Sequence, residues 1–380
     1  MKIEKIEIRI LEPKDHELKD LDFAMGYRFP KVDYGTWVRV TADGIKGHHC
    51  LLTPSSRGFA DFLELISRHY IGKDPFTILS ELWKEYKFER FVPHNYIPSM
   101  AIGVMNNAIW DIKGKAVGKP IYELIGGRKK KLKIYKTLGL GMSATPEDYA
   151  EKTEEAYSEG YRGVKIFTCG NYSQDLRNIE AIINTGLKLD VMLQACAFYD
   201  EHTAKFVAEK MDQLGAYSLG DPIDIDNIPG YLRIKKRLKK LYIAGAGTHF
   251  GFYRIKNLID SNALDIIRSD ANIAGGIDQA HRIAQYAEEN GKLFIPHTFN
   301  HLLSLADNLH VAAATSNCPY VEVPHMEGRD EYINLGVNKG LNIRVKEGKV
   351  EPPKGPGLGI DIDWESLDKY VVYSKTIDST

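Results

Sequence analysis

Segments typical of strands alternate with segments typical of helices over residues 133–324. Short apolar runs lie at 133–139, 162–170, 188–197, 216–222, 241–247, 265–270, 293–297 and 320–324. Between them, apolar residues recur three and four positions apart, which is typical of amphipathic helices. Eight strands alternating with helices predict an α/β fold with a closed parallel barrel. The last helical segment, 304–316, has a weak pattern and the chain after Glu322 has the composition of loops, so we expect the eighth strand to lack its own helix.

Residues 1–127 have a different pattern, which predicts a smaller α+β domain. The first eleven residues alternate between polar and apolar, and residues 36–53 contain two strand-like runs joined by the turn signal Ala42-Asp43-Gly44. Three helical patterns follow, at 60–71, 76–88 and 100–118. Tyr27 and Arg28 lie in an apolar-aromatic loop between the strands, which could cover a ligand or pack on a neighbouring element.

Charge and cysteine content exclude several classes of protein. Fifty basic residues oppose 51 acidic ones, so the net charge of −1 gives no basic field that would favour nucleic acid or an anionic membrane. The four cysteines have no spacing typical of a zinc site or a disulfide framework. No apolar run is long enough to span a membrane, and the N-terminal segment alternates like a strand rather than a cleavable signal. We therefore expect a soluble, cytoplasmic protein with a small-molecule ligand.

The stretch from Asp265 to Phe299 predicts a strand, a helix and a second strand. Because parallel strands joined by a helix end at the same edge of a sheet, Asp270 and His297 are expected to be neighbours. A carboxylate beside an imidazole fixes its tautomer and raises its pKa, as a general base requires. The alternative is a buried histidine that bonds to an acid for stability alone.

Further polar side chains stand at the ends of other predicted barrel strands, where the catalytic residues of such barrels lie. Lys165 and Phe167 are two residues apart and should face the same way. One lysine or glutamate at a strand end is usually solvated, but a lysine, a His-Asp pair and a glutamate at one mouth are hard to explain by packing. The candidate catalytic residues are His297, Asp270 and Lys165, and Glu322 is a further polar group at this edge.

Four motifs carry a resemblance to a known family. They are 109–120 with Tyr122, Leu124 and Gly126-Gly127; 265–267 with Asp270 and Gly275-Gly276; Pro296-His297; and 355–359 with the alternating acids that follow. On these motifs the chain resembles the enolase superfamily, in the branch of mandelate racemase and muconate lactonizing enzyme.

The resemblance implies a capping domain, residues 1–127, over a modified (β/α)7β barrel of TIM type, residues 128–350, with residues 351–380 returning to the cap. It also implies abstraction of a proton α to a carboxylate, to give an enediolate held by Mg²⁺, and a homo-oligomer. Such enzymes select their substrates with capping loops. Glu322 matches the position that contacts the substrate carboxylate in relatives. The candidate substrate-binding residues are Glu322, Gln194, Phe167, Tyr27 and Arg28.

This chain departs from the family pattern at the metal ligands. The family binds Mg²⁺ through acids at the ends of the third, fourth and fifth strands, and the matching positions hold Gln194, Gly220 and Gly247. These residues offer at most one neutral ligand, whereas Mg²⁺ needs octahedral oxygen ligation. We therefore expect no metal cofactor. Asp221 is expected to point away from the site unless the strand register slips, and a displaced metal site that uses Asp221, Asp224 or Asp226 stays open.

The second lysine of the family's second strand is also replaced, by Phe167, which argues against racemization by two bases. One hypothesis is a metal-independent lyase or isomerase that abstracts a proton from a sugar or sugar acid through His297 and Asp270. The alternative is a catalytically inactive descendant that binds a small carboxylate or has a structural or regulatory role. A pocket plugged by Phe167 and Tyr27 would favour the alternative.

Overall fold

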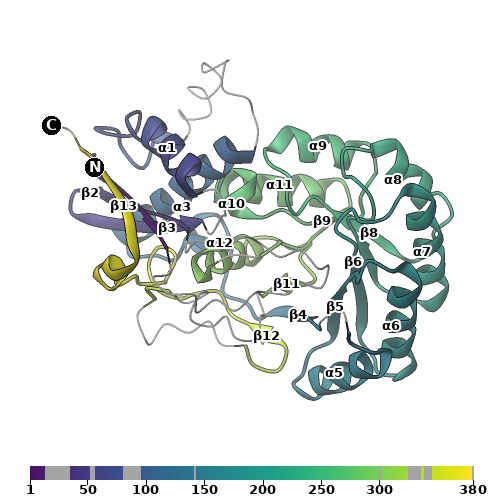
Figure 1. Ribbon diagram of the computed structural model, residues 1–380. Helices are drawn as coiled ribbons and strands as arrows, with labels where there is room; N and C mark the ends of the chain where they lie inside the picture. Colours follow the sequence, from purple (N-terminus) through teal and green to yellow (C-terminus); the bar gives the residue numbers. More distant parts are fainter. Residues whose placement is uncertain are drawn as a thin grey trace.

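A curled sheet of parallel strands forms the centre of the molecule (Figure 1). Its strand order is β10-β9-β8-β7-β6-β5-β4-β11. The strands are β4 (Leu132–Leu138), β5 (Gly163–Phe167), β6 (Asp190–Gln194), β7 (Ser218–Gly220), β8 (Tyr242–Gly245), β9 (Ile266–Ile267), β10 (Leu293–Phe294) and β11 (Val321–Glu322). A short strand, β12 (Lys349–Val350), pairs antiparallel with β4. This arrangement confirms the predicted α/β fold of the modified TIM-barrel type.

The structure is a computed structural model, and it describes residues 1–12, 35–51, 56–79, 96–140, 143–298, 301–323, 335–337 and 345–378. The predicted helix at 76–88 lies mostly outside these residues, as do Tyr27 and Arg28. None of the helices that the structure describes is both long and apolar enough to cross a membrane.

Helices alternate with the barrel strands and cover their outer face (Figure 1). They are α5 (Pro146–Ser158), α6 (Tyr172–Asn184), α7 (Glu201–Leu214), α8 (Ile228–Lys235), α9 (Phe252–Asp260), α10 (Ala271–Ala274), α11 (Ile277–Glu289) and α12 (Leu302–Ala313). Local sequence explains where they begin and end. Thr145 and Asp148 form a capping box at α5, and Asp200 caps α7, which ends at Gly215 with a φ of 78°.

Helix α12 is more regular than its weak sequence pattern suggests. All twelve of its residues are buried, because it packs against the barrel strand β11, helix α11 and the capping domain together. A helix that is covered on all sides needs no polar face, so its sequence lacks the usual amphipathic stripe.

The second part of the fold is an antiparallel sheet with the order β13-β1-β2-β3. Its strands are β1 (Ile3–Leu11), β2 (Thr36–Ala42), β3 (Ile45–Leu51) and β13 (Val371–Asp378). The predicted turn at Asp43-Gly44 joins β2 to β3, and both residues have a positive φ, as a two-residue hairpin turn requires. The C-terminal strand β13 pairs with β1, so the end of the chain returns to its beginning.

Helices α1 (Ser56–Ser67), α3 (Tyr96–Val117) and α4 (Ile121–Leu124) complete this part, and α3 packs against both β3 and α10. A fully buried polar network joins it to the barrel. Asp307 Oδ2 accepts from Asn107 Nδ2 at 2.8 Å and lies 2.6 Å from His49 Nε2. These contacts fix the sheet and α3 beside the carboxyl ends of the barrel strands.

Candidate active site at the carboxyl ends of the barrel strands

His297 and Asp270 lie together where β9 and β10 end. The two strands pair in parallel, with Phe294 opposite Ile267, so the residues after them leave the sheet at one edge. His297 Nδ1 is 3.5 Å from Asp270 Oδ2, which confirms the prediction that these two residues are neighbours. Asp270 also caps α10, because its Oδ1 accepts from the backbone N–H of Asn272 at 2.9 Å. The carboxylate is thus fixed by the backbone, while the His297 side chain stays 19% exposed.

Lys165 and Glu322 form a buried ion pair, and they belong to the two strands that flank β4. Lys165 belongs to β5 and Glu322 ends β11, and the lysine Nζ contacts the glutamate Oε1. The ammonium also lies 4.8 Å from the ring centre of Phe167 and 5.3 Å from that of Tyr135. Lys165 and Phe167 therefore do face the same way. Because Lys165 is only 4% exposed, it is enclosed by the site rather than solvated.

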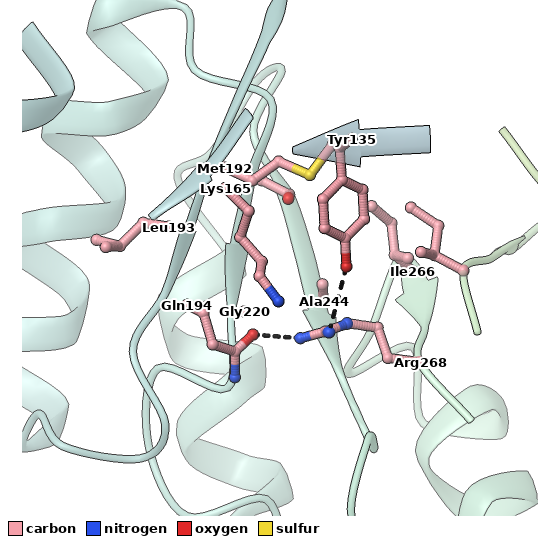
Figure 2. A pocket seen from close by; sticks show the side chains of 11 residues that line it. Tyr135, Lys165, Met192, Leu193, Gln194, Gly220, Ala244, Ile266 and Arg268 are labelled. Carbon is pink, nitrogen blue, oxygen red and sulfur yellow. Dashed lines mark hydrogen bonds between the residues drawn. The ribbon is translucent and has the colours of Figure 1, made fainter. Parts of the chain in front are cut away.

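Arg268, which is not among the residues predicted from the sequence, is the second cation of this site. Figure 2 shows its guanidinium facing Gln194 inside the barrel. Nη2 donates to Glu322 Oε2 at 2.6 Å, and Nη1 donates to Gln194 Oε1. A signal for it was present, because Arg268 stands two residues after Ile266 and two before Asp270. On an extended strand such residues share one face, and a cation beside the predicted acid points to the site.

Gln194 connects Arg268 to Asp221. Its Nε2 donates to Asp221 Oδ2 at 2.8 Å, while its oxygen accepts from the guanidinium. A guanidinium only donates and a carboxylate only accepts, so the amide has one orientation. The hydrogen bond to Gln194 shows that Asp221 faces the site, so the prediction that it points away is wrong. The reason is its φ of 41°, since side chains alternate between faces only on an extended backbone.

Left-handed backbone recurs at the ends of neighbouring strands in this region. Cys196 follows β6 with a φ of 50°, and Ala246 follows β8 with a φ of 75°. Such a conformation costs a residue with a side chain about 1–2 kcal/mol. Strain of this kind gathers at sites where side chains must be aimed, as the Asp221 carboxylate is here.

The charges of the site are set by burial and by one another. Burial alone would raise the pKa of the Glu322 carboxyl, but the charges of Lys165 and Arg268 outweigh it and hold this pKa well below its ordinary value. Burial lowers the pKa of the Lys165 ammonium, and Glu322 opposes that effect. Burial would also lower the pKa of Arg268, but Glu322 and Tyr135 reverse the direction and raise it. The site therefore holds a carboxylate between two cations.

A small cavity lies beside these charges within the barrel (Figure 2). Its volume is about 20 Å³, which is room for about one water molecule. Its lining includes Tyr135, Lys165, Met192, Gln194, Ile266 and Arg268. Among the described residues, this cavity is too small for a sugar acid.

The described residues do not fit a divalent cation at the positions that the resemblance implies. The Gln194 oxygen is bound to a guanidinium, and a Cβ on Gly220 would lie 2.3 Å from that oxygen. A Cβ on Gly247 would lie 3.2 Å from His297 Cδ2. An amide and an imidazole thus occupy the space in which acidic side chains at these positions would begin. Across the part of the chain that the structure describes, no three His, Cys, Asp or Glu side chains are grouped to hold a metal ion.

The alternative acids have other partners. Asp226 lies 3.3 Å from His249 and 3.4 Å from Arg254, and its side chain is 66% exposed. Asp224 is exposed and accepts a hydrogen bond from the backbone N–H of Asp226. Within the described residues Asp224 and Asp226 thus bind protein groups, and a displaced metal site that uses Asp221, Asp224 or Asp226 stays a prediction.

Comparisons with known proteins cover most of the chain. Residues 7–126 match the model of the mandelate racemase / muconate lactonizing enzyme N-terminal domain, and residues 148–366 match that of the enolase C-terminal domain-like family. The arabinonate dehydratase of Saccharolobus solfataricus is 29% identical over 336 residues, which are 87% of this chain and 88% of that protein. The D-galactonate dehydratase of Variovorax paradoxus is 26% identical over 311 residues, 78% of this chain and 80% of that one. A member of the enolase superfamily from Polaromonas sp. JS666 superposes with a TM-score of 0.87 at 26% identity, over 98% of each chain.

Proposed function

The chain belongs to the mandelate racemase and muconate lactonizing enzyme branch of the enolase superfamily, and we propose that it is a lyase that dehydrates a sugar acid or a related polyhydroxy carbonyl compound. The observation that carries this proposal is the His297–Asp270 pair, 3.5 Å apart at one edge of the barrel. The similarity to two sugar-acid dehydratases supports the substrate class.

The proposed reaction needs one group that takes a proton and returns it. His297, oriented by Asp270, takes the proton from the carbon next to the carbonyl or carboxylate group. The electron pair of that C–H bond forms a C=C bond as the hydroxyl group on the next carbon leaves. His297 returns its proton to the leaving oxygen, so water is released and an enol remains. The enol becomes a keto compound by gaining a proton at carbon from the solvent.

The developing negative charge must be stabilised, and this is usually the largest catalytic contribution. In the proposed enzyme, the cations of Lys165 and Arg268 supply it without a metal ion. Lys165 is enclosed between Glu322 and two aromatic rings. We therefore assign it to charge stabilisation rather than to proton abstraction.

Burial of the same charges favours a second candidate, a protein that binds a small acid without turnover. Lys165, Arg268 and Glu322 are each at most 5% exposed, and the adjacent cavity holds about one water. In this candidate the cluster is a rigid binding element and His297 has a structural role.

The two candidates differ in the effect of His297→Asn. The experiment incubates the purified protein with arabinonate, D-galactonate and other sugar acids, and with the neutral sugars, and measures 2-keto-3-deoxy product. We expect one acid to be converted by the wild type and the rate to fall by about 10²–10⁴-fold in His297→Asn, while ligand binding is kept. Binding without product from any acid would reject the lyase in favour of the second candidate.

A further inference from the structure

We infer that Arg268 is the built-in cation that holds the anionic group of the substrate, where related enzymes are expected to use a metal ion. This inference rests on the proposed function, since it names the group that would bind the acid. It adds a residue that neither the motifs nor the comparisons assign.

The guanidinium is fixed in the mouth of the barrel from two sides. Glu322 binds Nη2 at 2.6 Å, and the Gln194 oxygen binds Nη1. Asp221 binds the other end of the Gln194 amide, so the amide cannot turn to offer its N–H groups to the cation. Arg268 is 5% exposed, and arginine stays protonated even when buried. A preoriented, permanently charged group is thereby placed among the strand ends.

The cluster keeps hydrogen-bond donors for a ligand. A guanidinium has five N–H donors, and the described residues take up three of them, through Gln194, Glu322 and the Tyr135 hydroxyl. The ammonium of Lys165 has three, and within the described chain Glu322 takes up one. The donors that these residues leave on the guanidinium belong to Nη1 and Nε, because Glu322 and Tyr135 use both donors of Nη2. Arg268 can therefore give a carboxylate single charge-assisted hydrogen bonds, which are stronger than bonds between neutral groups.

The charge balance limits the class of ligand. Lys165 and Arg268 contribute two positive charges and Glu322 removes one, so the three side chains that contact one another leave one net positive charge. Asp221 bonds to the Gln194 amide, and its charge also raises the pKa of Arg268 through space, so it lowers the positive charge of the site further. A site with at most one net positive charge matches a monoanion, whereas a divalent metal ion would favour a dianion. We therefore assign the site to sugar monocarboxylates rather than to dicarboxylates.

The experiment measures binding of arabinonate, D-galactonate and the dicarboxylate galactarate in the presence of EDTA, by calorimetry and by the shift in melting temperature. Arabinose and galactose are the neutral controls. We expect a monocarboxylate to bind the wild type and its affinity to fall about ten- to hundredfold in Arg268→Gln, as for loss of hydrogen bonds to a charged group. Arg268→Lys keeps the charge with fewer hydrogen-bond donors and should lose less affinity.

Two controls separate binding from folding. Arg233→Gln removes an arginine from an exposed ion pair with Glu201 and should bind as the wild type does. If Arg268→Gln does not fold, Arg268→Lys replaces it, because it keeps a cation beside Glu322. Its affinity for the acid should still be lower than that of the wild type. A neutral sugar that binds as weakly to the wild type as to the variants would show that the lost affinity belongs to the carboxylate.

The results separate this inference from the proposed lyase. Affinity that depends on Arg268, without turnover of any acid, supports the inference and rejects the lyase. Turnover that requires Mg²⁺, or equal affinity in Arg268→Gln and the wild type, rejects the inference and leaves His297 as the candidate base. Absence of binding by every acid tested on the wild type also rejects the inference.

Discussion

Arg268 Nη2 donates a hydrogen bond to Glu322 Oε2 at 2.6 Å, although Arg268 follows β9, next to one end of the sheet order, and Glu322 belongs to β11, at the other end. Glu322 Oε2 also accepts from the backbone N–H of Thr298, which follows β10, at 3.2 Å. These contacts bring β11 and the β9–β10 edge together across the barrel. The residues that we propose for charge stabilisation therefore also help to close the barrel.

Glu322→Gln should destabilise the protein strongly. The change leaves Lys165 and Arg268 buried without their shared counter-ion, and loss of one partner of a buried pair costs about 3–5 kcal/mol. Denaturant unfolding of the variant and the wild type measures this cost. Glu201→Gln removes a carboxylate from the exposed pair with Arg233, and should cost less than about 1 kcal/mol. Equal losses in the two variants would contradict the structural role of the buried cluster.

Stability should fall as the pH falls from about 6.5 toward 4. Burial lowers the pKa of His301 to about 3 and that of His310 to about 4. In each ring the Nδ1 atom accepts a backbone hydrogen bond, from Leu303 and Tyr122 respectively, so protonation would break it. Below pH 6.5 these histidines are protonated in the unfolded chain but stay neutral in the folded chain. Each one therefore lowers the free energy of unfolding by about 1.4 kcal/mol for each pH unit of acidification.

Asp307 opposes this effect over a narrower range. Burial raises the pKa of Asp307 to about 6, from an ordinary value of 3.8, so between these values the folded state binds its proton first and gains stability on acidification. The effect of His301 and His310 is larger than that of Asp307, so the free energy of unfolding still falls as the pH falls. His310→Asn should flatten the slope by about 1.4 kcal/mol per pH unit, whereas His202→Asn, at an exposed position, should leave it unchanged. An unchanged slope in His310→Asn would contradict this account.

Asp270→Asn should separate the two tasks of this residue. Asparagine caps helices about as well as aspartate, so the bond to the Asn272 N–H persists and the loss of stability should be below about 1 kcal/mol. The charge that orients His297 is lost, so the rate of the proposed dehydration should fall by at least about tenfold and its pH profile should shift. Melting temperature and rate measured on the same preparation decide this. Unchanged activity with unchanged stability would show that His297 works without Asp270.

Gly220→Ala should weaken acid binding without touching a charged residue. Its new Cβ would lie 2.3 Å from the Gln194 oxygen, so the amide must move away from Arg268. Overpacking of this kind costs about 1–3 kcal/mol, and calorimetry should show lower affinity for the acid that the wild type binds. Gly139→Ala is the matched control, because no atom lies within 4 Å of its added Cβ. Normal binding by Gly220→Ala would mean that the position of Gln194 does not matter.

Strand and helix periodicity was enough to predict the barrel, and the pairing of Asp270 with His297 followed from the topology of a strand-helix-strand unit. The direction of Asp221 could not be predicted, because it depends on a left-handed backbone at a residue other than glycine. Arg268 was missed because its strand has only two regular residues, β9, and its partners Gln194 and Glu322 are 74 and 54 positions away. Contacts at such separations depend on how the barrel closes, which local patterns do not encode.

The most direct test of the account is proton NMR of a sugar acid in D₂O with the wild-type protein, with EDTA and then with excess MgCl₂. The account predicts a 2-keto-3-deoxy acid with one deuterium at carbon 3, because the enol takes its proton from the solvent. It predicts the same rate with EDTA and with MgCl₂, and a loss of product in His297→Asn. Product that forms only after MgCl₂ is added would contradict the central claim that Lys165 and Arg268 provide the stabilising charge.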